Sequence, residues 1–200
     1  MPQREPSETR ILTVAGEHLR RFGLKRFTVV AVAEEAGMTH ANVYRYFPSR
    51  TALVDAVVDA WLKQAERRLA DIADGPDPAD DKLERFVTHL SRSYLDKTGH
   101  DPRIFALLCD AVADDREVYR RHRQRVRALM GVIVEEGIAT RLFAGADPRR
   151  VELLIGDVMT RFIDPLILQR FDVQDLQHAD ARRDRVLRLL IRGLAAGRIG

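Results

Sequence analysis

The sequence of 200 residues has one cysteine, four lysines, few aromatic residues and no long uncharged apolar run. The lone Cys109 excludes an intramolecular disulfide and a multi-cysteine zinc site. The longest uncharged apolar stretches, such as 27–33 and 128–134, are only seven residues long, whereas a membrane-spanning helix needs about 20. No apolar leader is visible at the start of the chain. We therefore expect a cytoplasmic protein without a membrane partner.

The composition is that of a folded globular protein, and its charge is unevenly distributed. Apolar residues make up 46% of the chain and charged residues 32%, which argues against disorder. The net charge is only +3, but residues 1–50 hold 8 Lys and Arg against 5 Asp and Glu, whereas the remainder is balanced at 25 against 25. The basic excess in the first quarter is a weak indication of an anionic partner there.

The spacing of apolar residues predicts an all-α chain of about nine helices, with no period-two alternation typical of strands. Asp101-Pro102 and Asp147-Pro148 each place an N-cap acid before a proline at the first helical position. We expect a kink or short break at Pro165. The predicted helices are 7–22, 29–35, 40–46, 50–73, 80–97, 102–113, 115–143, 149–171 and 178–196.

Two short predicted helices, 29–35 and 40–46, flank the tripeptide Ala36-Gly37-Met38. A glycine here permits the positive φ that the tight corner of a helix–turn–helix motif requires. The second helix has an apolar face, with short polar side chains on the opposite face. In such a motif the second helix enters the major groove of DNA, with its N-terminal residues at the bases.

Seven residues are candidates for DNA contact: Thr28, Thr39, His40, Asn42, Tyr44, Arg45 and Arg50. Thr28 and Thr39 also suit helix N-caps, and a helix N-terminus can bind phosphate as well, so the two roles can coexist. His40 and Asn42 are either solvated or in contact with base edges, since asparagine can pair with adenine through two hydrogen bonds. Tyr44 either packs half-buried or bonds a phosphate.

The same region resembles the N-terminal signature of the TetR family of bacterial transcriptional repressors. The matching positions are Arg10, Ile11, Leu12, Ala15, Gly23, Thr28, Val32, Ala33, Ala36, Gly37, Tyr44, Tyr46, Phe47, Ser49, Arg50 and Leu53. Gly16 and His18 stand where the family commonly has apolar residues, and Arg50 stands where lysine is more common. A glycine inside a helix costs up to about 1 kcal/mol relative to alanine, whereas Arg50 keeps the charge.

The resemblance implies a helix–turn–helix DNA-binding domain of three helices over 1–50 and a connecting fourth helix over about 50–73. It implies a helical bundle over 74–200 for ligand binding and dimerisation. A homodimer of this kind binds a palindromic operator in double-stranded DNA, most often as a repressor, and a small-molecule inducer releases it. The DNA-contact candidates other than Arg45 fall at positions that touch the operator in relatives.

Residues on the fifth to eighth predicted helices are mostly apolar with a few polar tips, which suits a largely apolar ligand. The candidates for the pocket are Phe86, His89, Leu90, Tyr94, Phe105, Leu108, Cys109, Tyr119, His122, Val126, Met130, Met159 and Phe162. Candidates for a dimer interface on the last two helices are Leu154, Ile155, Val158, Leu187, Leu190, Ile191 and Leu194. Any of these residues can equally belong to the core.

Nothing in the sequence predicts an enzyme, a cofactor or a metal site. The six histidines are scattered, Cys109 lies on an apolar stretch, and no nucleotide-binding or nucleophile-elbow pattern occurs. Asp157, Arg161 and Asp164 are explained by an ion pair within one helix. The arginines between 116 and 127 have acidic neighbours and predict a solvated, salt-bridged helix.

Two other classes of protein remain open. One is a helix–turn–helix protein whose bundle only dimerises or binds a protein partner. The other is a helical-bundle enzyme with a basic N-terminal module. An enclosed cavity in the bundle would favour the ligand sensor, and a paired acid–base constellation inside it would favour the enzyme.

Overall fold

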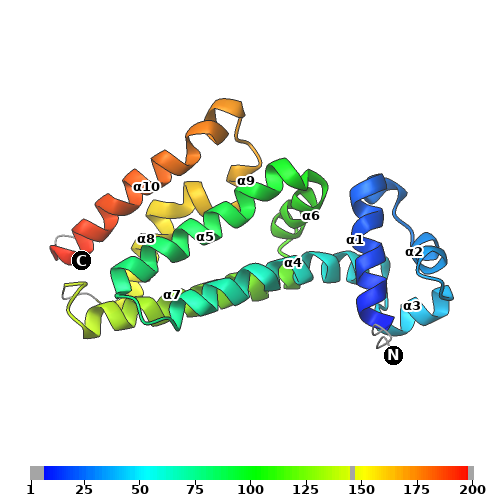
Figure 1. Cartoon of the computed structure of the whole chain (residues 1–200), viewed down its shortest axis with the longest axis horizontal. Coiled ribbons are helices and arrows are strands. Elements are labelled where there is room, and N and C mark those ends of the chain that lie inside the picture. Colours follow the sequence, from blue (N-terminus) through cyan, green and yellow to red (C-terminus); the bar gives the residue numbers. More distant parts are fainter. Residues whose placement is uncertain (1–6, 145–146, 198–200) are drawn as a thin grey trace.

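Three helices form a head at one end of an elongated molecule (Figure 1). The computed structural model describes residues 7–144 and 147–197. The head consists of α1 (Ser7–Arg26), α2 (Val29–Glu35) and α3 (His40–Tyr46). Its core joins apolar residues of all three helices, including Ile11, Leu19, Val32 and Val43.

The remaining helices form a bundle, and α4 connects it to the head (Figure 1). Their bounds are α4 (Arg50–Ala73), α5 (Ala79–His100), α6 (Pro102–Ala113), α7 (Glu117–Ala139), α8 (Pro148–Ile163), α9 (Pro165–Leu168) and α10 (Val173–Ala195). The long α4 packs on α1 near the head and on α5 and α7 in the bundle. The described residues contain helices and no strand, which confirms the all-α prediction. None of these helices is long and apolar enough to cross a membrane.

The predicted helix bounds differ from the structure mainly at helix ends. The helix α7 is shorter than predicted because Asp115 and Arg141, near its two ends, have positive φ values of 45° and 61°. The predicted eighth helix is broken before Pro165, and the Asp164 carboxylate caps the short α9 that follows. The last helix begins earlier than predicted, since Asp172 caps it by accepting a hydrogen bond from the Asp175 amide.

The two predicted N-cap acids differ in what they bind. Asp147 accepts a hydrogen bond from the Arg149 amide at the start of α8, as predicted. Asp101 makes no side-chain cap at the start of α6. Its carboxylate instead accepts a hydrogen bond from Arg20 of α1 at 2.8 Å and lies 3.4 Å from the Lys97 ammonium. This cap prediction was therefore wrong, because two cations compete for the same carboxylate.

The local features predicted for the helix–turn–helix are present. Gly37 has a φ of 67°, in the left-handed region that favours glycine. The hydroxyl of Thr28 accepts a hydrogen bond from the Ala31 amide at 3.1 Å, and the hydroxyl of Thr39 accepts one from the Asn42 amide at 3.2 Å. Both threonines are thus the N-caps of their helices.

Arg50, the first residue of α4, joins this helix to the head. Its guanidinium group donates to the carbonyl of Phe27 at 2.9 Å and to the carbonyl of Leu24. The Phe27 ring lies 5.9 Å from the guanidinium carbon. These carbonyls belong to the end of α1 and to the turn before α2, where the helical hydrogen-bond ladder stops. Arg50 therefore stabilises the joint between the head and α4.

We expect Gly16→Ala to stabilise the protein and Gly137→Ala to destabilise it. A Cβ at Gly16 meets only ordinary contacts with Arg20 and Val57, at 3.4 and 3.7 Å. The change should raise the free energy of unfolding by up to about 1 kcal/mol. A Cβ at Gly137 overlaps the buried ring of Phe143, so that change should lower it by about 1–3 kcal/mol. Urea denaturation checks both values, and equal effects would contradict the packing described here.

We expect Arg50→Lys to lower the free energy of unfolding by about 1 kcal/mol, because the two carbonyls are bonded by two different nitrogens of the planar guanidinium group, a geometry that the single nitrogen of lysine does not reproduce. The matched control is Arg45→Lys. Arg45 is exposed and bonds only the neighbouring Tyr46 hydroxyl among the described residues, so this change should have almost no effect. Urea denaturation of the two variants measures the difference, and equal stability would show that the joint does not depend on Arg50.

Candidate DNA-binding head and ligand cavity

The outer face of α3 carries four of the seven candidates for DNA contact. His40, Tyr44 and Arg45 are exposed, and Asn42 is half-buried, whereas Val43 points into the core. Tyr44 is 44% exposed. The arrangement leaves an amide, an imidazole, a phenol and a guanidinium group on one exposed short helix.

The other three candidates also make contacts within the head. Thr28 and Thr39 use their hydroxyl groups as N-caps, and both residues are exposed at helix N-termini. Such termini present backbone N–H groups to an anion. The guanidinium of Arg50 is bonded to the two carbonyls of the joint, a role that the sequence did not indicate. Arg50 is nonetheless an exposed residue.

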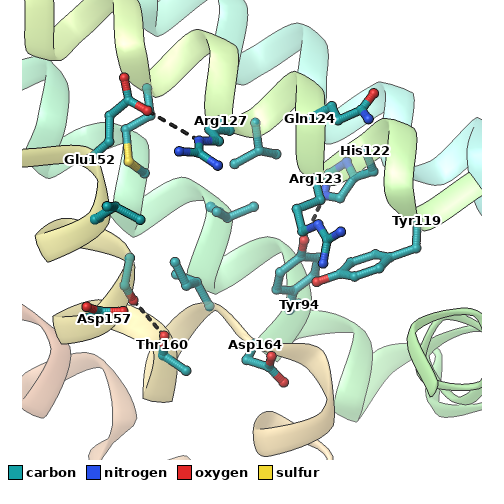
Figure 2. Close-up of a pocket in the computed structure, with 16 residues that line it drawn as sticks. Tyr94, Tyr119, His122, Arg123, Gln124, Arg127, Glu152, Asp157, Thr160 and Asp164 are labelled. Atoms are coloured by element: carbon teal, nitrogen blue, oxygen red, sulfur yellow. Dashed lines mark hydrogen bonds and ion pairs between the residues drawn. The ribbon is translucent and has the colours of Figure 1, made fainter. Parts of the chain in front are cut away.

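A cavity of about 750 Å³ lies among α5, α7 and α8 (Figure 2). It is partly open to solvent, and several of its lining residues, such as Arg123, Leu153 and Thr160, are exposed. Its walls combine apolar residues with a larger number of polar and charged ones. The lining residues are Leu90, Tyr94, Tyr119, His122, Arg123, Gln124, Val126, Arg127, Met130, Glu152, Leu153, Gly156, Asp157, Thr160, Ile163 and Asp164.

The structure brings only part of the predicted pocket set to this cavity. Leu90, Tyr94, Tyr119, His122, Val126 and Met130 line it. Six others are packed in the core and do not line it: Phe86, Phe105, Leu108, Cys109, Met159 and Phe162. His89 is half-buried outside the lining, where burial and then the charge of Arg68 lower its pKa. Helical spacing places such residues on an inward face without showing whether space is left beside them.

The polar half of the cavity was not foreseen. Arg123 and Arg127 were interpreted as part of a solvated arginine face, and Arg120 and Arg121 do form surface ion pairs with Glu117. However, Arg123 and Arg127 follow Tyr119 at intervals of four residues, which places them on the same side of α7. This spacing was the one signal in the sequence that could have identified them.

The ion pair expected within α8 is also corrected. Arg161 pairs with Asp175 of α10 at 2.9 Å, and not with Asp157 or Asp164. Asp157 and Asp164 instead line the cavity. The neighbouring α10 lies close enough to offer Arg161 a different carboxylate, a fact that spacing within one helix cannot show.

A chain of hydrogen bonds runs from the cavity to α4. The Nδ1 atom of His122 lies 2.6 Å from a carboxylate oxygen of Glu66 on α4. The Nε2 atom of His122 lies 2.7 Å from the Tyr94 hydroxyl on α5 (Figure 2). The side chains of Tyr94 and His122 are both 2% exposed. Three helices are thus connected by polar contacts beside the cavity.

Both phenols at this end of the cavity stay protonated at neutral pH. Burial raises the pKa of Tyr94 well above its usual range. Burial, and to a smaller extent the charge of Asp164, raises the pKa of Tyr119 to about 12. The two hydroxyl groups therefore act as neutral hydrogen-bonding groups.

Cys109 is not a nucleophile in this structure. Burial raises the pKa of its thiol to about 12, and its Sγ lies 3.6 Å from the carbonyl oxygen of Pro165. A thiol of this kind is inert at neutral pH. Among the residues that the structure describes, no group of three or more His, Cys, Asp or Glu residues is arranged to hold a metal ion.

The apolar residues predicted for a dimer interface divide between the core and the surface. Ile155, Leu187 and Leu194 are buried within the chain itself, and Leu190 is buried as well but lines a groove at the surface. Leu154 and Ile191 are half-buried, and Val158 is more exposed. Leu154, Val158, Val186, Leu189 and Leu190 line an apolar groove between α8 and α10. Sequence analysis did not identify the exposed Leu189 of the groove, because helical spacing does not predict apolar residues outside the buried stripe.

Comparison with known proteins places both parts of the chain in one family. Residues 11–57 match the profile of bacterial regulatory proteins of the tetR family, and residues 79–182 match that of the tetracycline repressor-like C-terminal domain. The nucleoid occlusion factor SlmA of Pasteurella multocida is 38% identical over 50 residues, which are 24% of this chain and 25% of that protein. This match thus spans about a quarter of the curated relative.

Two solved structures share the fold over nearly the whole chain. A TetR/AcrR-family transcriptional regulator from Thermobifida fusca has a TM-score of 0.70 at 22% identity, covering 93% of this chain and 97% of that one. A TetR-family regulator from Mesorhizobium loti has a TM-score of 0.68 at 14% identity, covering 93% and 95%. The C-terminal profile alone spans more than half of the 200 residues. The chain therefore belongs to the TetR family of bacterial transcriptional regulators, which are DNA-binding proteins and not enzymes.

Proposed function

We propose that this chain is a ligand-responsive repressor that binds a palindromic operator as a homodimer and is released by a small molecule bound in the cavity. The observation that carries this proposal is the placement of α4. Its first residue, Arg50, is bonded to the head, and Glu66 of the same helix is bonded to His122, which lines the cavity. A change in the cavity therefore acts on the helix that positions the head, and this is how two separate sites become energetically coupled.

In this proposal α3 is the recognition helix and enters the major groove of DNA. His40 and Asn42, near its N-terminus, meet base edges, whereas Tyr44 and Arg45 meet the phosphate backbone. The exposed N-termini at Thr28 and Thr39 add phosphate contacts through backbone amides. In this proposal residues 1–50 bind DNA and residues 74–200 bind the ligand and form the dimer. The helix α4 connects these two parts. Such a regulator works beside the bacterial chromosome, in the cytoplasm.

The groove between α8 and α10 is the proposed dimer interface. Leu189 is 69% exposed and lies on the groove next to Val158 and Val186. A two-fold axis along this groove brings the same residues of both subunits together. Burial of these side chains against their copies would then stabilise the dimer.

We expect Asn42→Ala and Tyr44→Phe to affect DNA binding in different ways. Loss of the Asn42 amide should relax the sequence preference at one base pair of each half-site, by about 1–3 kcal/mol of discrimination. Loss of the Tyr44 hydroxyl removes a phosphate contact, so it should weaken binding to all sequences alike. Selection of binding sites from random DNA, followed by affinity measurements on the selected operator and on a scrambled one, separates the two effects. An unchanged preference in Asn42→Ala would show that Asn42 does not read a base, and selected sites without two-fold symmetry would contradict the dimeric repressor.

We expect Leu189→Glu to convert the dimer to a monomer and to abolish operator binding, because a charge would be buried at the two-fold axis. The matched control is Val173→Glu. Val173 is also on α10 and also 69% exposed, but it lies outside the groove. Sedimentation velocity measures the oligomeric state of both variants. A dimeric Leu189→Glu protein would show that another surface holds the subunits together.

A further inference from the structure

The charged residues that line the cavity leave an excess of negative charge. The lining contains two cations, Arg123 and Arg127, and three carboxylates, Glu152, Asp157 and Asp164. Arg127 is already paired with Glu152, since its Nε atom lies 3.3 Å from a carboxylate oxygen. The remaining charges of the lining are therefore Arg123 against Asp157 and Asp164.

Asp164 is the carboxylate best placed to bind a cation inside the cavity. It is half-buried, whereas Asp157 is exposed, so water and salt screen its charge. Arg161, one turn before Asp164, is paired with Asp175 of α10, and Asp164 makes no ion pair with any described residue. Its Oδ1 atom accepts hydrogen bonds from two amides of α9, at 2.8 and 3.1 Å, but no described residue donates to Oδ2. This second oxygen is therefore available to a ligand.

The charge of Asp164 acts on the two phenols at the same end of the cavity (Figure 2). Burial raises the pKa of Tyr119, and the charge of Asp164 adds more to this shift than the charge of Arg123 takes away. Burial also raises the pKa of Tyr94, and the charge of Asp164 again adds to the shift. The electrostatic potential at this end is thus set more by the carboxylate than by the arginine, which favours a cation there.

Aromatic rings form one wall at this end. The centroid of the His122 ring lies 6.2 Å from that of Tyr94 and 6.3 Å from that of Tyr119. The faces of phenol rings attract cations. The carboxyl group of Glu66 lies 2.6 Å from Nδ1 of His122, so a positive charge on the imidazole would already have its counter-ion outside the cavity lining.

The other walls offer apolar surface to the body of a ligand. Leu90, Val126, Met130 and Ile163 supply this surface from α5, α7 and α8, and a Cβ built at Gly156 meets no atom within 4 Å. The volume of about 750 Å³ is in the range of pockets that hold drug-sized ligands. Because the cavity is partly open to solvent, a charged group can enter it without losing all of its hydration.

We propose that the cavity binds an amphipathic cation, an organic amine with an apolar body, and that its ammonium group lies beside the Asp164 carboxylate. This inference rests on the proposed ligand-sensing function and adds the charge and the chemical class of the ligand. An ammonium group at this end also lies next to Tyr94, whose hydroxyl contacts His122, which in turn contacts Glu66 on α4. The ligand thus has a polar route to the helix that positions the head.

Three biphenyl probes of nearly equal shape and different charge test the inference by calorimetry on the purified full-length protein. At neutral pH 4-phenylbenzylamine is a cation, 4-phenylbenzyl alcohol is uncharged and biphenyl-4-carboxylate is an anion. We expect the amine to bind roughly tenfold more tightly than the alcohol, as for one charge-assisted hydrogen bond, and the carboxylate to bind more weakly than both. Equal affinities of amine and alcohol, tightest binding of the carboxylate, or failure of the amine to bind would each overturn the inference, whatever the variants show.

Two asparagine variants then locate the charge that is recognised. Asp164→Asn removes the charge, but its amide oxygen can still accept the hydrogen bonds that cap α9, so this variant should bind the amine and the alcohol equally well. Asp147→Asn is the matched control, because Asp147 also caps a helix and lies outside the cavity lining, and it should keep the tenfold preference. Retention of the preference in Asp164→Asn, or its loss in both variants, would overturn the assignment. Binding of the alcohol by Asp164→Asn shows that this variant is folded.

A variant with the opposite expected effect does not depend on the folding of Asp164→Asn. Arg123→Gln removes a lining cation that is in no ion pair among the described residues, so the preference for the amine should rise about threefold. The matched control is Arg125→Gln, since Arg125 is exposed on the same helix but outside the lining, and it should leave the preference unchanged. A lower preference in Arg123→Gln would overturn the inference.

Operator affinity measured with and without 4-phenylbenzylamine tests release separately from binding. The amine should weaken operator binding by the wild-type protein but not by Asp164→Asn, and this comparison excludes an effect of the amine on the DNA itself. If the amine binds selectively through Asp164 but leaves operator affinity unchanged, the proposed release mechanism fails and the recognition of the cation stands.

Discussion

Burial of one continuous apolar face of α4 is the constraint on which the rest of the structure depends. Near its start, Leu53 and Val57 complete the core of the head, and Val57 lies against Gly16 of α1. Further along, Leu62 and Leu69 are buried in the bundle, where α4 packs on α5 and α7. A single rigid helix therefore belongs to two cores. Neither core can move against α4 without loss of apolar contacts.

Polar contacts between α1 and the start of α6 also hold the head against the bundle. Arg20 of α1 is bonded to Asp101 at the junction of α5 and α6, and Arg103 of α6 donates to the carbonyls of Arg20 and Arg21. These carbonyls lie just before Gly23, where the helical geometry of α1 is interrupted. The head is thus held both through α4 and through α6. Any rearrangement that reaches the head from the cavity has to act on one of these two connections.

Much of the fold was predictable because its determinants are local. The positive φ at Gly37, the hydroxyl caps at Thr28 and Thr39, and the interruption at Pro165 all follow from single residues and their immediate neighbours. The errors occurred where distant groups compete for a residue. Asp101 was expected to cap its own helix and instead binds Arg20, and Arg161 was expected to pair within α8 and instead binds Asp175. Spacing along one helix does not show which neighbouring helix supplies a closer partner.

The sequence by itself determined the all-α architecture, the helix–turn–helix and the exposed face of α3, since helical periodicity and capping act within a few residues. Only the tertiary structure decided how the apolar residues of the bundle divide among core, cavity and surface. Phe105 and Tyr119 each lie on the apolar stripe of their own helix, yet Phe105 is packed in the core and Tyr119 lines the cavity. The same holds for the charges, because Arg123 faces the cavity and Arg120 faces solvent on a single arginine-rich helix. The physical reason is that a cavity is defined by the space between helices, and that space depends on how they pack together.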